Sequence, residues 1–221
     1  MSGDTHAELY DLLAPKGIIA VLEIDDPGDA VPLCRALVAG GISAIELALR
    51  TEAAEPSIER IARDVPEMTI GIGTIIKSGQ AQRVKKLGAA FGLAPGFNPA
   101  IAAEAKQANL PFIPGIVTPS ELEAALEAGA SILKFFPAEP SGGASYLKSL
   151  NNPYNYLKLS YIPLGGVSEE NIGQYANIPQ VLGIGGTWIA QRPLIRAKQW
   201  DEISRRAKRA IAIWQAYRGT K

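Results

Sequence analysis

The sequence has one cysteine and one histidine among its 221 residues. Cys34 lies in an apolar helical pattern without a disulfide partner, so we interpret it as a small core residue. His6 lies in the leading segment. A histidine-rich zinc site, a Ser-His pair and a Cys-His pair all need histidines that the chain lacks. We therefore expect no metal centre and no nucleophile activated by histidine.

The chain also lacks an excess of charge and a long apolar run. Lysine plus arginine equals aspartate plus glutamate, at 22 each, and the isoelectric point is about 6.6. No basic field is therefore present to attract nucleic acid or an anionic membrane. No apolar stretch approaches the roughly 18 residues of a membrane span, and the amino terminus lacks a secretory signal pattern. We expect a cytoplasmic protein with neither nucleic acid nor membrane as a partner.

Strand-like and helix-like apolar patterns alternate along the chain. Strands are expected over residues 18–22, 42–49, 69–75, 90–94, 112–114, 132–136, 158–162 and 181–184. Helices are expected over residues 5–13, 26–38, 51–63, 78–87, 99–107, 119–128, 169–176 and 198–217, while residues 142–156 are poorly defined. This order predicts an α/β protein, a (β/α)₈ TIM barrel with an additional N-terminal helix. A doubly wound open sheet is the alternative. No linker divides the chain, so residues 1–221 form one predicted domain, with 1–16 as its helical extension.

An internal repeat refines the barrel prediction. Three helix-to-strand junctions share a glycine that can supply a left-handed helix terminus: Gly41, Gly88 and Gly129. Five residues beyond these glycines lie Glu46, Leu93 and Lys134, on the second, fourth and sixth predicted strands. Alternate strands contribute to one inward layer of such a barrel. Glu46 and Lys134 should therefore meet near the carboxyl ends of the strands, where this fold builds its active sites.

Lys134 is the only charge in the apolar run I-L-K-F-F. Lysines are rarely buried without a partner or a purpose. Burial disfavours the charged form of an amine, so a buried lysine can attack a carbonyl and form a Schiff base. A neighbouring carboxylate such as Glu46 would transfer the protons. Two other interpretations of Lys134 remain. Its amine reaches solvent, or Lys134 and Glu46 form a buried ion pair that is purely structural.

Other polar groups and glycines follow the predicted strands. Arg50 lies just past the second strand and suits a carboxylate or a phosphate, and Thr74 offers a hydroxyl at the end of the third. The alternative for both Arg50 and Thr74 is a solvated position at the strand ends that binds no ligand. Gly-Gly turns follow the last two strands, at 165–166 and 185–186. Barrels often bind phosphate at these loops, through backbone amides and a helix amino terminus.

These motifs together resemble one family. The sequence is similar to the bacterial 2-keto-3-deoxy-6-phosphogluconate (KDPG) aldolases, which often also act as 4-hydroxy-2-oxoglutarate (KHG) aldolases. The similarity runs from about Gly17 to the final helix. It rests on the segments A-G-G-I-S-A-I-E-L-A-L-R-T-E, G-I-G-T, A-P-G-F, I-P-G-I-V-T-P-S-E, K-F-F-P-A-E, G-G and G-G-T-W.

The resemblance implies a class I aldolase on a (β/α)₈ barrel, usually a homotrimer, that needs no metal or other cofactor. Lys134 would form the Schiff base with pyruvate or with the C2 ketone of the phosphorylated ketoacid, and Glu46 would move protons through a water. Arg50 and Thr74 match residues at the pyruvate carboxylate, and Pro95 and Phe136 match residues that line the pocket. The phosphate-binding elements are matched by Gly165, Gly166, Gly185, Gly186 and Thr187, where the family more often has serine in place of Thr187.

Three departures from the family pattern affect the expected substrate preference. Leu164 stands where a threonine hydroxyl commonly helps to hold the ketoacid, which leaves more of that task to Thr74 and Arg50. Ala20 stands where proline is frequent, and Glu23 stands where a basic or neutral residue is frequent.

We therefore expect reversible cleavage of KDPG to pyruvate and glyceraldehyde 3-phosphate, with cleavage of KHG to pyruvate and glyoxylate as a second activity. Two alternatives remain. One is a phosphosugar isomerase or epimerase that uses Glu46 as its base and survives loss of Lys134. The other is a non-catalytic phosphosugar-binding relative, for which Leu164 is the only hint.

Overall fold

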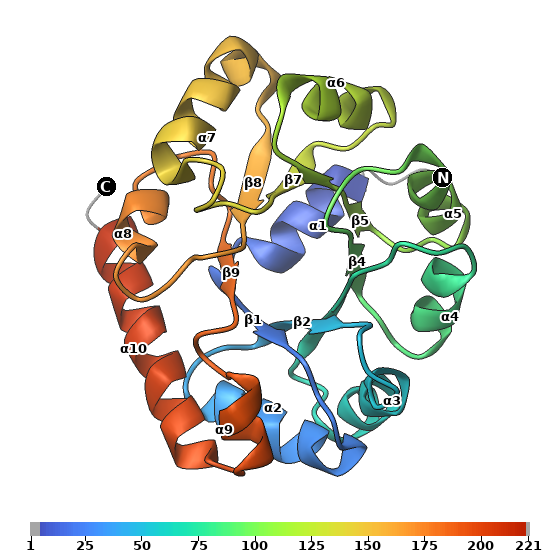
Figure 1. Cartoon of the computed structure of the whole chain (residues 1–221), viewed down its shortest axis with the longest axis vertical. Coiled ribbons are helices and arrows are strands. Elements are labelled where there is room, and N and C mark those ends of the chain that lie inside the picture. Colours follow the sequence, from blue (N-terminus) through green and yellow to red (C-terminus); the bar gives the residue numbers. More distant parts are fainter. Residues whose placement is uncertain (1–4, 220–221) are drawn as a thin grey trace.

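The computed structural model describes residues 5–219, so the ends of the predicted domain, 1–4 and 220–221, lie outside the described residues. Strands and helices alternate along the chain (Figure 1). The strands are β1 Ile18–Leu22, β2 Ala44–Ala48, β3 Thr69–Gly73, β4 Phe91–Leu93, β5 Phe112–Ile113, β6 Gly115–Ile116, β7 Ile132–Phe135, β8 Ser160–Pro163 and β9 Ile184–Gly186. The α-helices are α1 Thr5–Leu13, α2 Ala30–Ala39, α3 Ala54–Asp64, α4 Gln80–Lys86, α5 Pro99–Gln107, α6 Pro119–Glu127, α7 Gly143–Asn151, α8 Ile172–Ala176, α9 Arg192–Arg196 and α10 Trp200–Arg218. Two 3₁₀ helices, η1 Pro27–Asp29 and η2 Asn152–Leu157, complete the order.

The strands form two parallel sheets that curve around a common centre, with α1 across that centre and the other helices on the outside (Figure 1). One sheet has six strands in the order β5-β4-β3-β2-β1-β9, and the other has three in the order β6-β7-β8. A single parallel bridge joins Tyr161 of β8 to Val181, just before β9. The predicted α/β class with parallel strands is confirmed. The ladders form two curved sheets, and the complete ring of eight strands stays a prediction.

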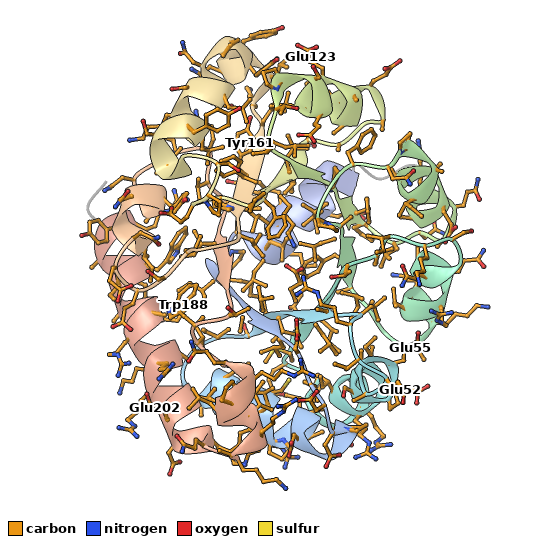
Figure 2. The ribbon with its side chains drawn as sticks, viewed as in Figure 1. Glu52, Glu55, Glu123, Tyr161, Trp188 and Glu202 are labelled. Carbon is orange, nitrogen blue, oxygen red and sulfur yellow. The ribbon has the colours of Figure 1, made fainter. Side chains whose placement is uncertain are left out.

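Side chains alternate between the two faces of the strands, and this alternation creates two cores. The inner core holds Ile132 of β7 and Ile162 of β8, and Leu9 and Leu13 of α1 pack onto it. The outer core lies between the strands and the surrounding helices. Tyr161 of β8 belongs to the outer core and points toward α7, where its hydroxyl donates to Asn151 Oδ1 at 2.9 Å (Figure 2). Residues two positions from Ile132 and Ile162 therefore face the centre.

The three junction glycines that define the internal repeat have the predicted left-handed conformation. Their φ values are 91° at Gly41, 110° at Gly88 and 88° at Gly129. Residues with a Cβ rarely adopt this region, so glycine is favoured at each position. The shared turn gives the strands that follow the same starting register.

The structure corrects several predicted boundaries. The strand expected over 112–114 divides at Pro114, which has no N–H to donate, into β5 of one sheet and β6 of the other. The strand expected over 181–184 instead covers Ile184–Gly186, because Gly185 and Gly186 pair with β1. The poorly defined residues 142–156 form α7 and most of η2. Helix α9 was not predicted, since its five residues are too short for a helical period to show.

No helix within residues 5–219 is long and apolar enough to cross a membrane.

Cys34 is fully buried in α2, as expected for a core residue. Burial raises the pKa of its thiol to about 12. The thiolate is the reactive form, so iodoacetamide at about pH 8 should leave Cys34 unmodified in the native protein and alkylate it after denaturation. Intact-mass measurement of both samples checks this. Equal labelling rates in both states would show that α2 opens readily.

Candidate active site

The two candidate catalytic residues meet inside the inner core. Glu46 lies at the middle of β2, and Lys134 lies on β7, two residues beyond the inward-facing Ile132. The Lys134 Nζ donates to Glu46 Oε1 at 2.8 Å, across 88 positions of sequence. Lys134 is 5% exposed and Glu46 2% exposed. The prediction that strand register brings these residues together is confirmed.

Space for the Glu46 carboxylate comes from Gly73, the last residue of β3. A Cβ at Gly73 would lie 2.1 Å from Glu46 Oε1 and 2.8 Å from its Cδ, closer than atoms can approach. Glu46 Oε2 is buried and has no hydrogen-bond partner among the described residues. An unsatisfied buried carboxylate oxygen is costly and rare. The pair therefore keeps one acceptor that can receive a hydrogen bond from a ligand.

Aromatic and apolar groups surround the lysine. Its Nζ lies 5.1 Å from the centre of the Phe136 ring, within the range of a cation–π contact. Phe136 is partly buried and packs against the inner core. Pro95 follows β4, and its carbonyl lies 2.1 Å from where a Cβ on Gly115 would be. Since Gly115 pairs with Lys134, Pro95 lies one strand away from the lysine, whereas Phe136 contacts the lysine amine itself.

Arg50 and Thr74 lie together at the carboxyl ends of β2 and β3, as their positions in the sequence predict. The Arg50 Nε donates to Thr74 Oγ1 at 3.3 Å. Thr74 has a φ of 63°, a strained value for a residue with a branched Cβ. Such strain often marks a functional position, and here it holds the hydroxyl against the guanidinium. Half of the Arg50 side chain is exposed, so an anionic ligand can reach it.

Gly165 and Gly166 follow β8 as predicted, whereas Gly185 and Gly186, predicted as a turn after the last strand, are the last two residues of β9. Gly165 and Gly166 have φ values of 91° and 84°. A Cβ on Gly165 would touch the Phe136 ring at 3.1 Å, which places this turn beside the ring that contacts Lys134. Gly185 lies against Leu164, whose Cδ2 would be 2.7 Å from an added Cβ. Gly186 ends β9, and the exposed Thr187 follows it.

Leu164 is 2% exposed and belongs to the inner core. It covers Gly185 with an apolar side chain. The wall between the two Gly-Gly segments therefore offers no hydroxyl at this position.

A comparison of the whole sequence with protein families places the chain. The family model described as KDPG and KHG aldolase matches residues 10–206. The chain belongs to this family.

Relatives in the family match over nearly their whole length. The 2-dehydro-3-deoxy-phosphogluconate aldolase of Haemophilus influenzae is 36% identical over 209 residues, which cover 95% of this chain and 98% of that protein. The KHG/KDPG aldolase of Escherichia coli K12 is 36% identical over 207 residues, covering 94% of this chain and 95% of that protein.

A solved structure from the family has the same fold. It is the KDPG aldolase of Legionella pneumophila, with pyruvate captured at low pH as a covalent carbinolamine intermediate. The two chains superpose with a TM-score of 0.86 at 33% identity, covering 90% of this chain and 96% of the other.

Two residues at the rim were missed as site candidates. Glu23, just past β1, accepts from Arg50 Nη1 at 2.8 Å and from Arg192 Nη1 at 3.2 Å. Glu23 was noticed only as a departure from the family pattern. Arg192 had no sequence signal, because it opens the unpredicted helix α9.

Proposed function

We propose that the chain is a class I aldolase that reversibly cleaves KDPG to pyruvate and glyceraldehyde 3-phosphate. The observation that carries this proposal is the buried Lys134–Glu46 pair with its spare acceptor, Glu46 Oε2. A Schiff-base enzyme needs an amine nucleophile and an adjacent group that transfers protons. Membership of the family and the named activities of its relatives support the same chemistry.

In the proposed mechanism, the Lys134 amine attacks the C2 ketone and forms a carbinolamine, which loses water to give an iminium ion. Glu46 removes the proton of the C4 hydroxyl through a water as the C3–C4 bond breaks. The electron pair of that bond moves into an enamine, with the iminium nitrogen as its acceptor, and the aldehyde leaves. Protonation of the enamine at C3 and addition of water release pyruvate and restore the amine. The carbinolamine named for the Legionella pneumophila structure supports the first step.

The other site residues would bind the two ends of the substrate. Arg50 and Thr74 are proposed to hold the ketoacid carboxylate, with Leu164 offering no third polar group. Pro95 and Phe136 are proposed to line the pocket on either side of the Schiff base. The contacts of Pro95 with Gly115 and of Phe136 with Lys134 support this arrangement.

The phosphate is proposed to bind at the ends of β8 and β9. Backbone amides of the two Gly-Gly segments would donate to it, and the Thr187 hydroxyl would add one contact: Gly165, Gly166, Gly185, Gly186 and Thr187. The position of the Gly165 turn beside Phe136 and the exposure of Thr187 support this proposal.

We propose one domain built on a complete eight-stranded barrel, in which β5 and β6 act as one strand interrupted at Pro114. Pro114 accepts from the Lys134 amide at 2.8 Å, and Leu182 donates to Tyr161 at 2.9 Å where the ring would close. By resemblance, we further propose a cytoplasmic homotrimer that cleaves KHG to pyruvate and glyoxylate as a second activity and requires no cofactor.

The proposal is tested by coupling pyruvate release to lactate dehydrogenase. KDPG should be cleaved with a kcat/KM at least about tenfold above that of 2-keto-3-deoxygluconate, which lacks only the phosphate, because charge-assisted hydrogen bonds to the phosphate would be lost. KHG measured in parallel reports the second activity. A folded protein that releases pyruvate from none of the three substrates would refute the aldolase proposal.

A further inference from the structure

A chain of contacts, made of one hydrogen bond to a hydroxyl and several ion pairs, runs along the carboxyl ends of the strands. It connects residues that follow adjacent strands in the sheet order β3-β2-β1-β9: Thr74, Arg50, Glu23 and Asp25, and Arg192 with Arg196 on α9. Each contact joins one strand end to the next. This chain of contacts therefore links α9, which follows the last strand, to Arg50, the residue proposed to hold the ketoacid carboxylate.

Arg50 is held from two sides. Its Nε donates to Thr74 Oγ1 at 3.3 Å, and its Nη1 donates to Glu23 Oε1 at 2.8 Å. Within residues 5–219, its third nitrogen, Nη2, has no hydrogen-bond partner. A planar guanidinium that is bonded at both Nε and Nη1 cannot rotate without breaking one contact. The two contacts thus select the nitrogen that Arg50 presents to a ligand.

Glu23 is itself anchored. Its second oxygen accepts from Arg192 Nη1 at 3.2 Å. Arg192 Nε donates to both carboxylate oxygens of Asp25, at 3.1 and 2.9 Å, and Asp25 also accepts from Arg196 Nε at 2.6 Å. Two hydrogen bonds lower the pKa of Asp25: the one from Arg192 has the larger effect and the one from Arg196 the next largest. The Asp25 carboxylate therefore stays charged. The side chain of Glu23 is 25% exposed, half the exposure of Arg50.

We infer that Glu23 is a positioning residue for Arg50, and that Arg192 fixes Glu23 in the orientation this requires. The inference rests on the proposed function, in which Arg50 binds the substrate carboxylate. Partly exposed ion pairs add little to the stability of a fold. The effect that we assign to this chain of contacts is therefore on the orientation of the Arg50 side chain. A binding group that is already oriented loses less freedom when the ligand arrives.

Removal of Glu23 has two opposed effects. Loss of orientation weakens binding of the ketoacid, whereas loss of a negative charge near Arg50 strengthens it. The two effects are separable, because Glu23→Gln removes the charge and keeps an oxygen that can accept from Arg50. Positioning predicts that Glu23→Ala weakens binding and that Glu23→Gln restores most of it. An effect of charge alone predicts tighter binding in both variants.

The test measures the pyruvate concentration that half-saturates borohydride trapping on Lys134, together with kcat and KM for KDPG. Glu23→Ala should raise the half-saturating concentration and KM about tenfold, while kcat stays within about twofold of the wild type. Arg192→Ala should change both in the same direction. Arg209→Ala is the matched control, since Arg209 pairs with Glu169 outside this chain of contacts, and it should change neither.

A double-mutant cycle identifies Arg50 as the route of the effect. Adding Glu23→Ala to Arg50→Ala should change pyruvate binding no further, because a residue that acts through Arg50 has nothing left to position. The inference is overturned if Glu23→Ala tightens or does not alter binding, or if its penalty persists in the Arg50→Ala background. A wild-type protein that forms no adduct overturns the proposed function itself, whereas trapping that Glu23→Ala leaves unchanged overturns only this inference.

Discussion

Replacement of Lys134 by methionine is expected to abolish turnover. The variant keeps the apolar stem of the side chain but has no amine to attack the ketone, so no iminium can form. We expect kcat/KM for KDPG to fall by roughly 10⁴-fold or more, the scale on which loss of a covalent nucleophile acts. A coupled assay of pyruvate release at high enzyme concentration measures the residual rate.

The control for Lys134→Met must separate loss of the amine from loss of stability, because the substitution also removes the partner of the buried Glu46. Lys134→Met leaves Glu46 as an unpaired carboxylate that is 2% exposed, and breaking such a pair costs about 3–5 kcal/mol of stability. The Lys134→Met/Glu46→Gln double variant removes both charges and should recover much of that stability without recovering activity. Near-normal turnover in a folded Lys134 variant would contradict the mechanism and favour an isomerase or epimerase that uses Glu46 as its base.

Gly73→Ala is expected to lower kcat strongly, although it replaces neither catalytic residue. The added Cβ would lie 2.1 Å from Glu46 Oε1, so the carboxylate must move away from Lys134 or the strand must shift. Glu46 can turn more easily than β3 can move. A displacement of about 1 Å at a reacting group can lower a rate 10²-fold, and we expect a loss of that order in kcat.

Gly96→Ala is the matched control, because nothing lies within 4 Å of where its Cβ would be and its φ is not positive. Its activity and melting temperature should resemble those of the wild type. If Gly73→Ala also keeps full activity and a native melting temperature, the contact between Lys134 and Glu46 is not required for turnover.

The meeting of Glu46 and Lys134 was predictable because the position of a residue along its own strand follows from the sequence just before that strand. A junction glycine with left-handed φ begins each repeat, and a fixed count from that glycine places Glu46 and Lys134 on the inward face. The alternation of inner and outer core residues on β7 then makes Lys134 face the centre. Periodicity and turn chemistry are enough for such an inference.

The rest of the site depends on contacts between distant segments. Arg192 and Glu23 are 169 positions apart and meet only after β9 pairs with β1. The role of Gly73 was equally hidden, because the space that it leaves for the Glu46 carboxylate exists only once β3 pairs with β2. β9 was predicted to end at Ile184, two residues too early, because Gly185 and Gly186 lack the apolar side chains by which strands are recognised.

The most direct measurement is borohydride reduction of the protein with and without pyruvate, followed by peptide mass spectrometry. The account predicts a pyruvate-dependent mass increase on the peptide that contains Lys134, and none on the same peptide of the Lys134→Met variant. Borohydride fixes the Schiff base as a secondary amine, so the adduct identifies the nucleophile by position. A folded wild-type protein without an adduct, or with its adduct on another lysine, would contradict the central claim.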